Sequence, residues 1–127
     1  MRLNGVRIGR NTMISLGAKI DSHAGKVNIG DNCHITYGSV ILSHDGAAKN
    51  MRADDYGAGA VIIGNKLFVG VNAMILRNGR IGDNSVIGAG AVVTGNIPAN
   101  SLVVGNPAKV VRSINTPADP FDQVEHK

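Results

Sequence analysis

Aromatic residues are scarce in this chain, which narrows the ways in which a core can be built. The 127 residues include no Trp, two Phe and two Tyr, yet 43% are apolar. The core must therefore consist mainly of aliphatic side chains and Ala. Few aromatic rings are left to stack on nucleic-acid bases, and the basic residues behind the net charge of +4 are scattered. This charge suits a polyanionic cofactor equally well, and we expect no nucleic-acid partner.

Cysteines and long apolar runs are also lacking. Cys33 is the single cysteine, so no internal disulfide can form and a reducing compartment is expected. No apolar run approaches the roughly 18–20 residues that span a membrane. Residues 1–5 lack the apolar region of a signal peptide. These features favour a cytoplasmic location and no membrane partner.

A six-residue repeat is the main signal that the sequence does contain. Aliphatic residues recur at intervals of six, and a Gly often follows them. This period fits neither the 3.6-residue turn of a helix nor the alternation of a simple hairpin. It fits a triangular solenoid, in which three hexapeptides make one coil and the aliphatic residues stack inside. The three runs are Ile8, Ile14 and Ile20; Ile29, Ile35 and Ile41; and Ile63, Val69, Ile75, Ile81, Ile87 and Val93.

Breaks in the repeat indicate where the chain leaves the solenoid. The step from Ile20 to Ile29 is nine residues, which is an insertion of three. The step from Ile41 to Ile63 is 22 residues instead of six, so 16 are surplus and an extruded loop is expected over about residues 43–60. After Val93 the pattern stops, and residues 102–107 are expected to cap about four full coils and a partial fifth.

The breaks therefore predict one all-β domain over residues 1–114. The polar residues 115–127 are expected to form a C-terminal tail. Such a short stack has a small core, and its flat faces are suited to packing against copies of itself. We therefore expect a cyclic homotrimer.

From about residue 6 to residue 114 the chain resembles the hexapeptide-repeat acyltransferases, in particular the galactoside, maltose and polysaccharide O-acetyltransferases. The resemblance is carried by the stretch from Ile-Gly-Asn at 63–65 to Arg112, including IGDNSVIGAG at 81–90, VVT at 92–94 and GNPAKVVR at 105–112. It implies a left-handed parallel β-helix and a homotrimer with CoA sites between subunits. It also implies transfer of an acetyl group from acetyl-CoA to a hydroxyl or amine of a small acceptor such as a sugar. The N-terminal helical segment of the galactoside and maltose enzymes is missing from this sequence.

His44 opens the predicted loop, in the segment Ser-His-Asp-Gly at 43–46. Acetyl transfer needs a base that removes the proton of the acceptor, and imidazole groups generally suit this role at neutral pH. The resemblance assigns His44 as this general base; the simpler alternative is a surface histidine. A carboxylate would orient its ring, and Asp21 and Asp45 are candidates, although Asp is also common at corners. His23 lies one coil away and could line the acceptor pocket or be solvated.

The resemblance also implies a set of cofactor contacts. Phe68 replaces the family's Trp that stacks on pantetheine, and the backbone N–H of Val71 corresponds to an oxyanion donor. Ala89 and Thr94 match positions that line the cofactor, and Lys109 and Arg112 match basic residues that meet its phosphates. Gly95 stands where the family usually has a Lys, so one phosphate contact is expected to be lost. The residues that match cofactor positions are Phe68, Val71, Ala89, Thr94, Lys109 and Arg112.

Acceptor contacts are less well defined by the sequence. Ser15 takes the place of an Asn that often contacts the acceptor in the family. In the predicted loop, Arg52 or Lys49 could meet an anionic acceptor such as a nucleotide sugar, or the loop could be merely solubilising.

Two other functions remain as alternatives. A non-catalytic scaffold is one, because solenoids often serve as assembly modules. The γ-class carbonic anhydrases share this fold but need three histidines on zinc, and only His44 lies near the corresponding loop, so we expect no metal. Cys33 is a poor nucleophile candidate, because its place in the repeat points into the core.

Overall fold

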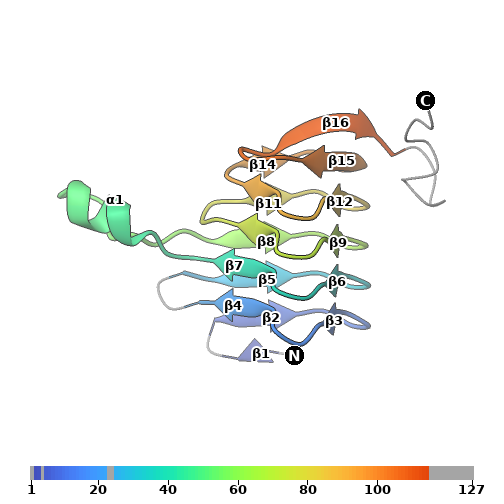
Figure 1. The fold of residues 1–127 in the computed structure, drawn as a ribbon. Coiled ribbons are helices and arrows are strands. Elements are labelled where there is room, and N and C mark those ends of the chain that lie inside the picture. Colours follow the sequence, from blue (N-terminus) through green and yellow to red (C-terminus); the bar gives the residue numbers. More distant parts are fainter. Residues whose placement is uncertain (1, 4, 23–24, 115–127) are drawn as a thin grey trace.

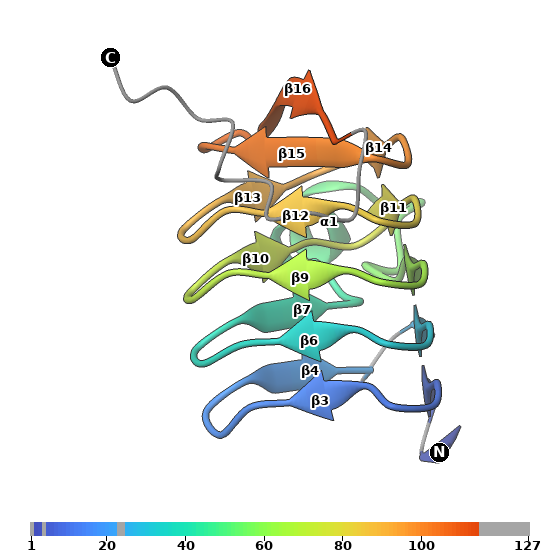
Figure 2. The same cartoon turned by 90° about the vertical axis from the view of Figure 1, so that its right-hand side faces the viewer.

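The computed structural model describes residues 2–3, 5–22 and 25–114, which form a left-handed parallel β-helix with three sheets (Figures 1 and 2). Sheet A contains β1 (Arg2–Leu3), β2 (Val6–Ile8), β5 (Val27–Ile29), β8 (Val61–Ile63), β11 (Arg80–Ile81) and β14 (Asn96–Ile97). Sheet B contains β3 (Met13–Ile14), β6 (His34–Ile35), β9 (Phe68–Val69), β12 (Val86–Ile87), β15 (Ser101–Val104) and β16 (Lys109–Ser113). Sheet C contains β4 (Lys19–Asp21), β7 (Val40–Leu42), β10 (Met74–Ile75) and β13 (Val92–Val93).

Each coil passes once through every sheet, so residues of successive coils lie side by side. Neighbouring strands are parallel, except that β1 runs antiparallel to β2 and β16 antiparallel to β15. In sheet C, for example, Ile41 of β7 lies opposite Ile20 of β4 and Ile75 of β10. This register stacks the repeat residues in inward rows, which confirms the predicted solenoid.

The inward rows form a continuous aliphatic core. Ile35, Ile41, Ile75 and Ile87 are completely buried, and Ile29, Ile63 and Ile81 of sheet A are nearly so, whereas Ile8 of the first coil is half-buried. Burying one such side chain stabilises a fold by about 1.5–3 kcal/mol, so the rows are the main source of stability. Cys33 is also buried within this core.

Asparagines at the corners provide backbone conformations that most residues avoid. Asn72 has a φ of 59° and Asn84 a φ of 56°, both in the left-handed region that Asn tolerates better than most residues. The Asn84 side chain also donates a hydrogen bond of 2.8 Å to Asn100 one coil further on. The corner residues thus turn the chain and link successive coils.

The row in sheet A continues further than the sequence pattern indicated. Ile97 of β14 lies opposite Ile81 of β11 and is buried. It comes four residues after Val93 instead of six, because the corner is two residues shorter there. The three-residue insertion after Ile20 and the long loop after Ile41 also lie between sheets C and A. We call this corner, built by residues 21–22, 25–26, 43–60, 76–79 and 94–95, the loop corner.

The long loop protrudes from the loop corner and carries one helix (Figure 1). This helix, α1 (Gly46–Met51), was not predicted. It begins after Asp45, whose side chain accepts a hydrogen bond of 2.9 Å from the backbone N–H of Ala48. In the described part of the chain, no helix has the length and apolar character needed to cross a membrane.

Candidate active site

The side chains of His44 and Asp21 are in contact at the loop corner. Asp21 ends β4 and lies opposite Leu42 of the next coil, and His44 follows Leu42 by two residues. The ring atom Nδ1 of His44 contacts Oδ2 of Asp21. With Asp21 accepting the Nδ1 proton, the neutral ring carries its lone pair on Nε2. The two side chains are 42% and 28% exposed, so the pair is accessible to a substrate.

Ser43 fixes the backbone on both sides of this pair. It is completely buried, and its N–H and hydroxyl donate hydrogen bonds of 3.1 and 2.8 Å to the carbonyl oxygen of Asp21. Its own carbonyl accepts a hydrogen bond of 2.9 Å from the N–H of Gly59, and His44 pairs with Ala58 in an antiparallel bridge. The His44 backbone is therefore held between the preceding coil and the returning end of the loop.

Arg77 anchors the loop from the following coil. Its Nη1 and Nη2 atoms each donate a hydrogen bond of 2.8 Å to one carboxylate oxygen of Asp55, and its Nε lies 3.7 Å from Oδ2 of Asp45. The Arg77 hydrogen bonds, together with one from the N–H of Gly57, hold the pKa of Asp55 well below its usual range. The same pairing raises the pKa of Arg77. Sequence reasoning missed Arg77, because nothing in its local pattern distinguishes it from other basic corner residues.

The two candidate carboxylates have different roles. Asp21 pairs with the His44 ring, whereas Asp45 caps α1 and faces Arg77. The structure therefore associates Asp21 with the imidazole and gives Asp45 a place in the loop anchor.

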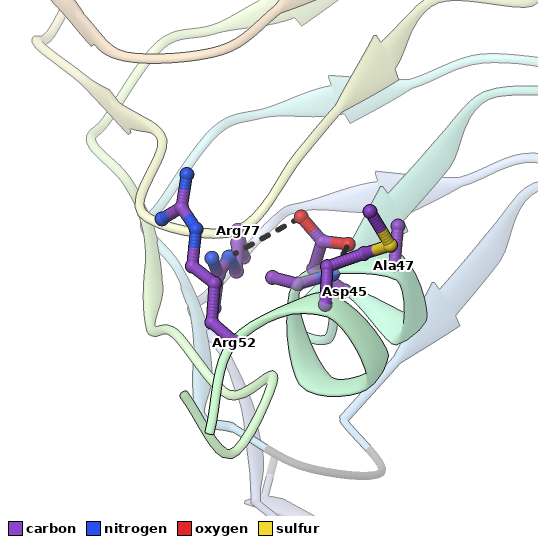
Figure 3. A pocket seen from close by; sticks show the side chains of 6 residues that line it. Asp45, Ala47, Arg52 and Arg77 are labelled. Atoms are coloured by element: carbon purple, nitrogen blue, oxygen red, sulfur yellow. Dashed lines mark hydrogen bonds and ion pairs between the residues drawn. The ribbon is translucent and has the colours of Figure 1, made fainter. Parts of the chain in front are cut away.

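Two pockets meet at the Asp45–Arg77 pair. The pocket beside His44 has a volume of about 260 Å³ and is lined by Leu42, His44, Asp45, Gly46, Leu76 and Arg77. The neighbouring pocket has a volume of about 270 Å³ and is lined by Asp45, Ala47, Ala48, Met51, Arg52 and Arg77 (Figure 3). A ligand beside the imidazole would therefore contact Leu42 of sheet C, Leu76 of the loop corner and the first residues of the loop, with Arg52 one pocket away.

Other residues selected from the sequence lie on the outer face of sheet B. Phe68 packs edge-on against His34, with ring centroids 5.5 Å apart, and Nε2 of His34 lies 3.2 Å from the hydroxyl of Ser15. Val71 and Ala89 are exposed at the corner that joins sheets B and C. Within one chain, Ser15 and these three cofactor candidates are thus not gathered around the His44 ring.

The remaining candidates are divided between the two regions. Thr94 follows β13 at the loop corner, as Leu76 follows β10. Lys109 and Arg112 lie on β16, the edge strand of sheet B, with Arg112 opposite Leu102. The Nε and Nη2 atoms of Arg112 are shielded from solvent, and the described residues provide no hydrogen-bond partner for them.

His23 lies outside the described residues. Among residues 2–3, 5–22 and 25–114, no three His, Cys, Asp or Glu side chains come together as ligands for a metal ion.

The coils and their inward rows define a protein built from hexapeptide repeats. A family model described as "hexapeptide repeat of succinyl-transferase" matches residues 5–43 and 60–95, the two stretches on either side of the long loop. The chain therefore belongs to the hexapeptide-repeat family.

Known proteins with the same fold include several acetyltransferases. The galactoside O-acetyltransferase of Escherichia coli is 38% identical over 117 residues, which cover 87% of this chain and 55% of that protein. The structure of the polySia-specific acetyltransferase NeuO matches with a TM-score of 0.79 and 31% identity, over 94% of this chain and 56% of that one. A hexapeptide-repeat acetyltransferase from Vibrio cholerae, solved with acetyl-CoA, matches with a TM-score of 0.77 and 27% identity, over 88% and 62%. The chain thus spans between about half and two thirds of these relatives.

Proposed function

We propose that this protein is an acetyltransferase that moves an acetyl group from acetyl-CoA to a hydroxyl of a small acceptor, with His44 as the general base. The observation that carries the proposal is the contact of His44 with Asp21, together with the pocket at the mouth of the extruded loop that His44 lines. The acetyltransferases among the similar proteins support the same reaction. A sugar or sugar derivative is the proposed acceptor, and an amine acceptor would use the same base.

The reaction follows from the chemistry of the pair. Nε2 of His44 takes the proton of the acceptor hydroxyl while the hydroxyl oxygen attacks the carbonyl carbon of the thioester. Asp21 stabilises the resulting imidazolium through Nδ1. The carbon–sulfur bond then breaks, the acetyl ester forms, and the imidazolium returns the proton to the departing CoA thiolate. The negative charge that develops on the thioester carbonyl oxygen needs a hydrogen-bond donor, and we propose the backbone N–H of Val71 for this role.

The residues proposed for the cofactor fit an anionic, partly apolar molecule. Two shielded guanidinium nitrogens of Arg112 lack a partner among the described residues, and Lys109 lies on the same strand. Both suit CoA phosphates. Phe68 offers a half-exposed ring for the pantetheine arm, and we propose that Ala89 and Thr94 line its path.

A second copy of the chain would complete the proposed site. His44 lies at the loop corner, whereas Phe68 and Val71 lie on sheet B and at the next corner, so one chain holds only part of the set. Exposed apolar residues, among them Leu16 and Tyr37, run along the corner between sheets B and C and provide a surface for such a contact. We propose a homotrimer in which each site lies between two subunits.

Ser15, His23 and Arg52 stay as proposed acceptor contacts. Arg52 lines the pocket next to that of His44, where its charge would favour an acceptor with an anionic group. Such an acceptor would place its hydroxyl at His44 and its anion toward α1.

Calorimetric titration with acetyl-CoA tests the proposal. Wild type should bind saturably, and the double variant Lys109→Ala/Arg112→Ala should bind at least tenfold more weakly.

His44→Ala should bind acetyl-CoA normally and lose most acetyl transfer, whereas Cys33→Ala should keep its activity. Arg7→Ala removes an exposed charge from sheet A and serves as the control for net charge. No binding at millimolar acetyl-CoA by a folded protein would instead support a non-catalytic scaffold.

A further inference from the structure

The loop that follows His44 has little apolar contact with the β-helix. Helix α1 has no buried residue, and Met51 and Tyr56 are largely exposed. Without a hydrophobic anchor, the position of such a segment depends on a few polar contacts. The geometry of the pocket beside His44 therefore depends on those contacts.

Besides the backbone hydrogen bonds at its base, the loop has side-chain contacts to the β-helix wall that converge on Arg77. Arg77 binds Asp55 through two hydrogen bonds and Ala58 through a longer one of 3.5 Å, and it pairs with Asp45. Asp45 immediately follows His44 on the outgoing side of the loop. Ala58 lies opposite His44 on the returning side. Arg77 therefore holds both ends of the loop at the level of the imidazole.

The geometry of this contact is specific to arginine. The planar guanidinium matches both oxygens of Asp55, and the Arg77 and Asp55 side chains are only 17% and 18% exposed. A lysine in the same place could offer one point charge but not two parallel hydrogen bonds. The loop anchor thus has a defined geometry in addition to its charge.

We propose that Arg77 is a positioning residue for the acceptor: by clamping Asp45 and Asp55, it sets the shape of the pocket formed by Leu42, Leu76 and the start of the loop. This inference rests on the proposed acetyl transfer at His44. Among the proposed acetyl-CoA contacts, Thr94 lies at the loop corner, whereas the others lie on sheet B or at the corner between sheets B and C, away from the clamp. Loosening the clamp should therefore affect the acceptor much more than the cofactor.

Kinetics of Arg77→Met test this role against Arg80→Met as a matched control. Arg80 is an exposed arginine of β11, so its replacement removes the same charge without touching the loop. Misplacing a substrate by about 1 Å can cost on the order of 100-fold in rate. We expect Arg77→Met to lower kcat/KM for the acceptor by about 10- to 100-fold, with the Kd for acetyl-CoA within about twofold of wild type. Arg77→Lys should not restore activity, because it lacks the second hydrogen bond.

Hydrogen exchange of the loop amides tests the clamp without any enzyme assay. Residues 46–58 should exchange at least tenfold faster in Arg77→Met and in Asp55→Asn than in wild type, and the double variant should exchange no faster than either. The coils should keep their protection, which shows that the variants fold. Unchanged loop exchange, or equal kinetic effects of Arg77→Met and Arg80→Met, would overturn the inference.

The two measurements separate failure of this inference from failure of the proposed function. If wild type transfers no acetyl group, the proposed function and the acceptor role fail together, while exchange still reports whether the clamp exists. If wild type is active and Arg77→Met is equally active, only the positioning role fails.

Discussion

Replacing Asp21 by Asn tests the chemical core of the proposed mechanism. The substitution keeps the shape of the side chain but removes the negative charge that faces Nδ1 of His44. An amide can hydrogen-bond to the ring through either its oxygen or its nitrogen, so it neither fixes the tautomer nor stabilises an imidazolium as a carboxylate does. The kcat should therefore fall while acetyl-CoA binding is maintained.

The size of the effect follows from the environment of the pair. A hydrogen bond to a charged group contributes about 1.5–3 kcal/mol, and every 1.4 kcal/mol in a barrier corresponds to about tenfold in rate. The full range is thus roughly 10- to 150-fold. Because Asp21 is 28% exposed and His44 42% exposed, water screens the interaction, and we expect the lower end of the range.

Release of free CoA thiol in the presence of acceptor measures kcat directly. Asp31→Asn is the matched control, since Asp31 is a carboxylate of another corner that accepts a hydrogen bond of 2.7 Å from the N–H of Arg10. His44→Ala should be slower than Asp21→Asn, and adding Asp21→Asn to it should change nothing, because the carboxylate acts through the ring. Wild-type kcat in Asp21→Asn, or an additive loss in the double variant, would refute the reasoning.

Further predictions concern the scaffold and the loop. Ile75→Ala should destabilise the fold by about 2–5 kcal/mol in urea denaturation, because Ile75 is fully buried. Cys33 should resist alkylation in the native protein and react after unfolding, since burial raises the pKa of its thiol. Asn72→Val should lower the Tm and Asn72→Gly should not, because φ at this position is 59°. Arg77 lowers the pKa of Asp55, so the stability of the clamp should be fully present above the usual pKa of an aspartate and lost only as the pH falls through the lowered value. Loop exchange, corrected for its intrinsic pH dependence, should therefore stay constant from about pH 7 to about pH 5, and a loss of protection within that range would contradict the shift.

The regular part of the fold could be predicted because the six-residue spacing of the aliphatic residues indicates which side chains point inward. A step of six returns the chain to an inward position, so Ile63, Ile75 and Ile81 could be placed without a structure. Ile97 was missed because the shortened corner changes the spacing to four although the coil continues. Helix α1 was missed because its six residues have no buried face and hence no apolar periodicity.

The site could be predicted only where a residue lies at a break in the repeat. His44 stood out because it opens the long loop, and the equal steps from Ile20 to Ile41 and from Asp21 to Leu42 place Asp21 near it. Arg77 could not be found in this way. It contacts Asp55 across 22 residues of chain, and this contact depends on how the irregular loop folds back.

The insertion after Ile20, the long loop after Ile41 and the shortened corner after Val93 all lie at the loop corner. Their common position affects how such proteins can diversify. The inward rows resume in register after each change, so a segment of new length adds nothing to the core and disturbs none of it. Recombination or engineering could therefore exchange residues 45–58 as a cassette and leave His44 in the constant frame. Position 77 would have to travel with the cassette, because it carries the matching half of the attachment. The β-helix would then act as a constant frame, and new specificities could arise by substituting this one exchangeable part.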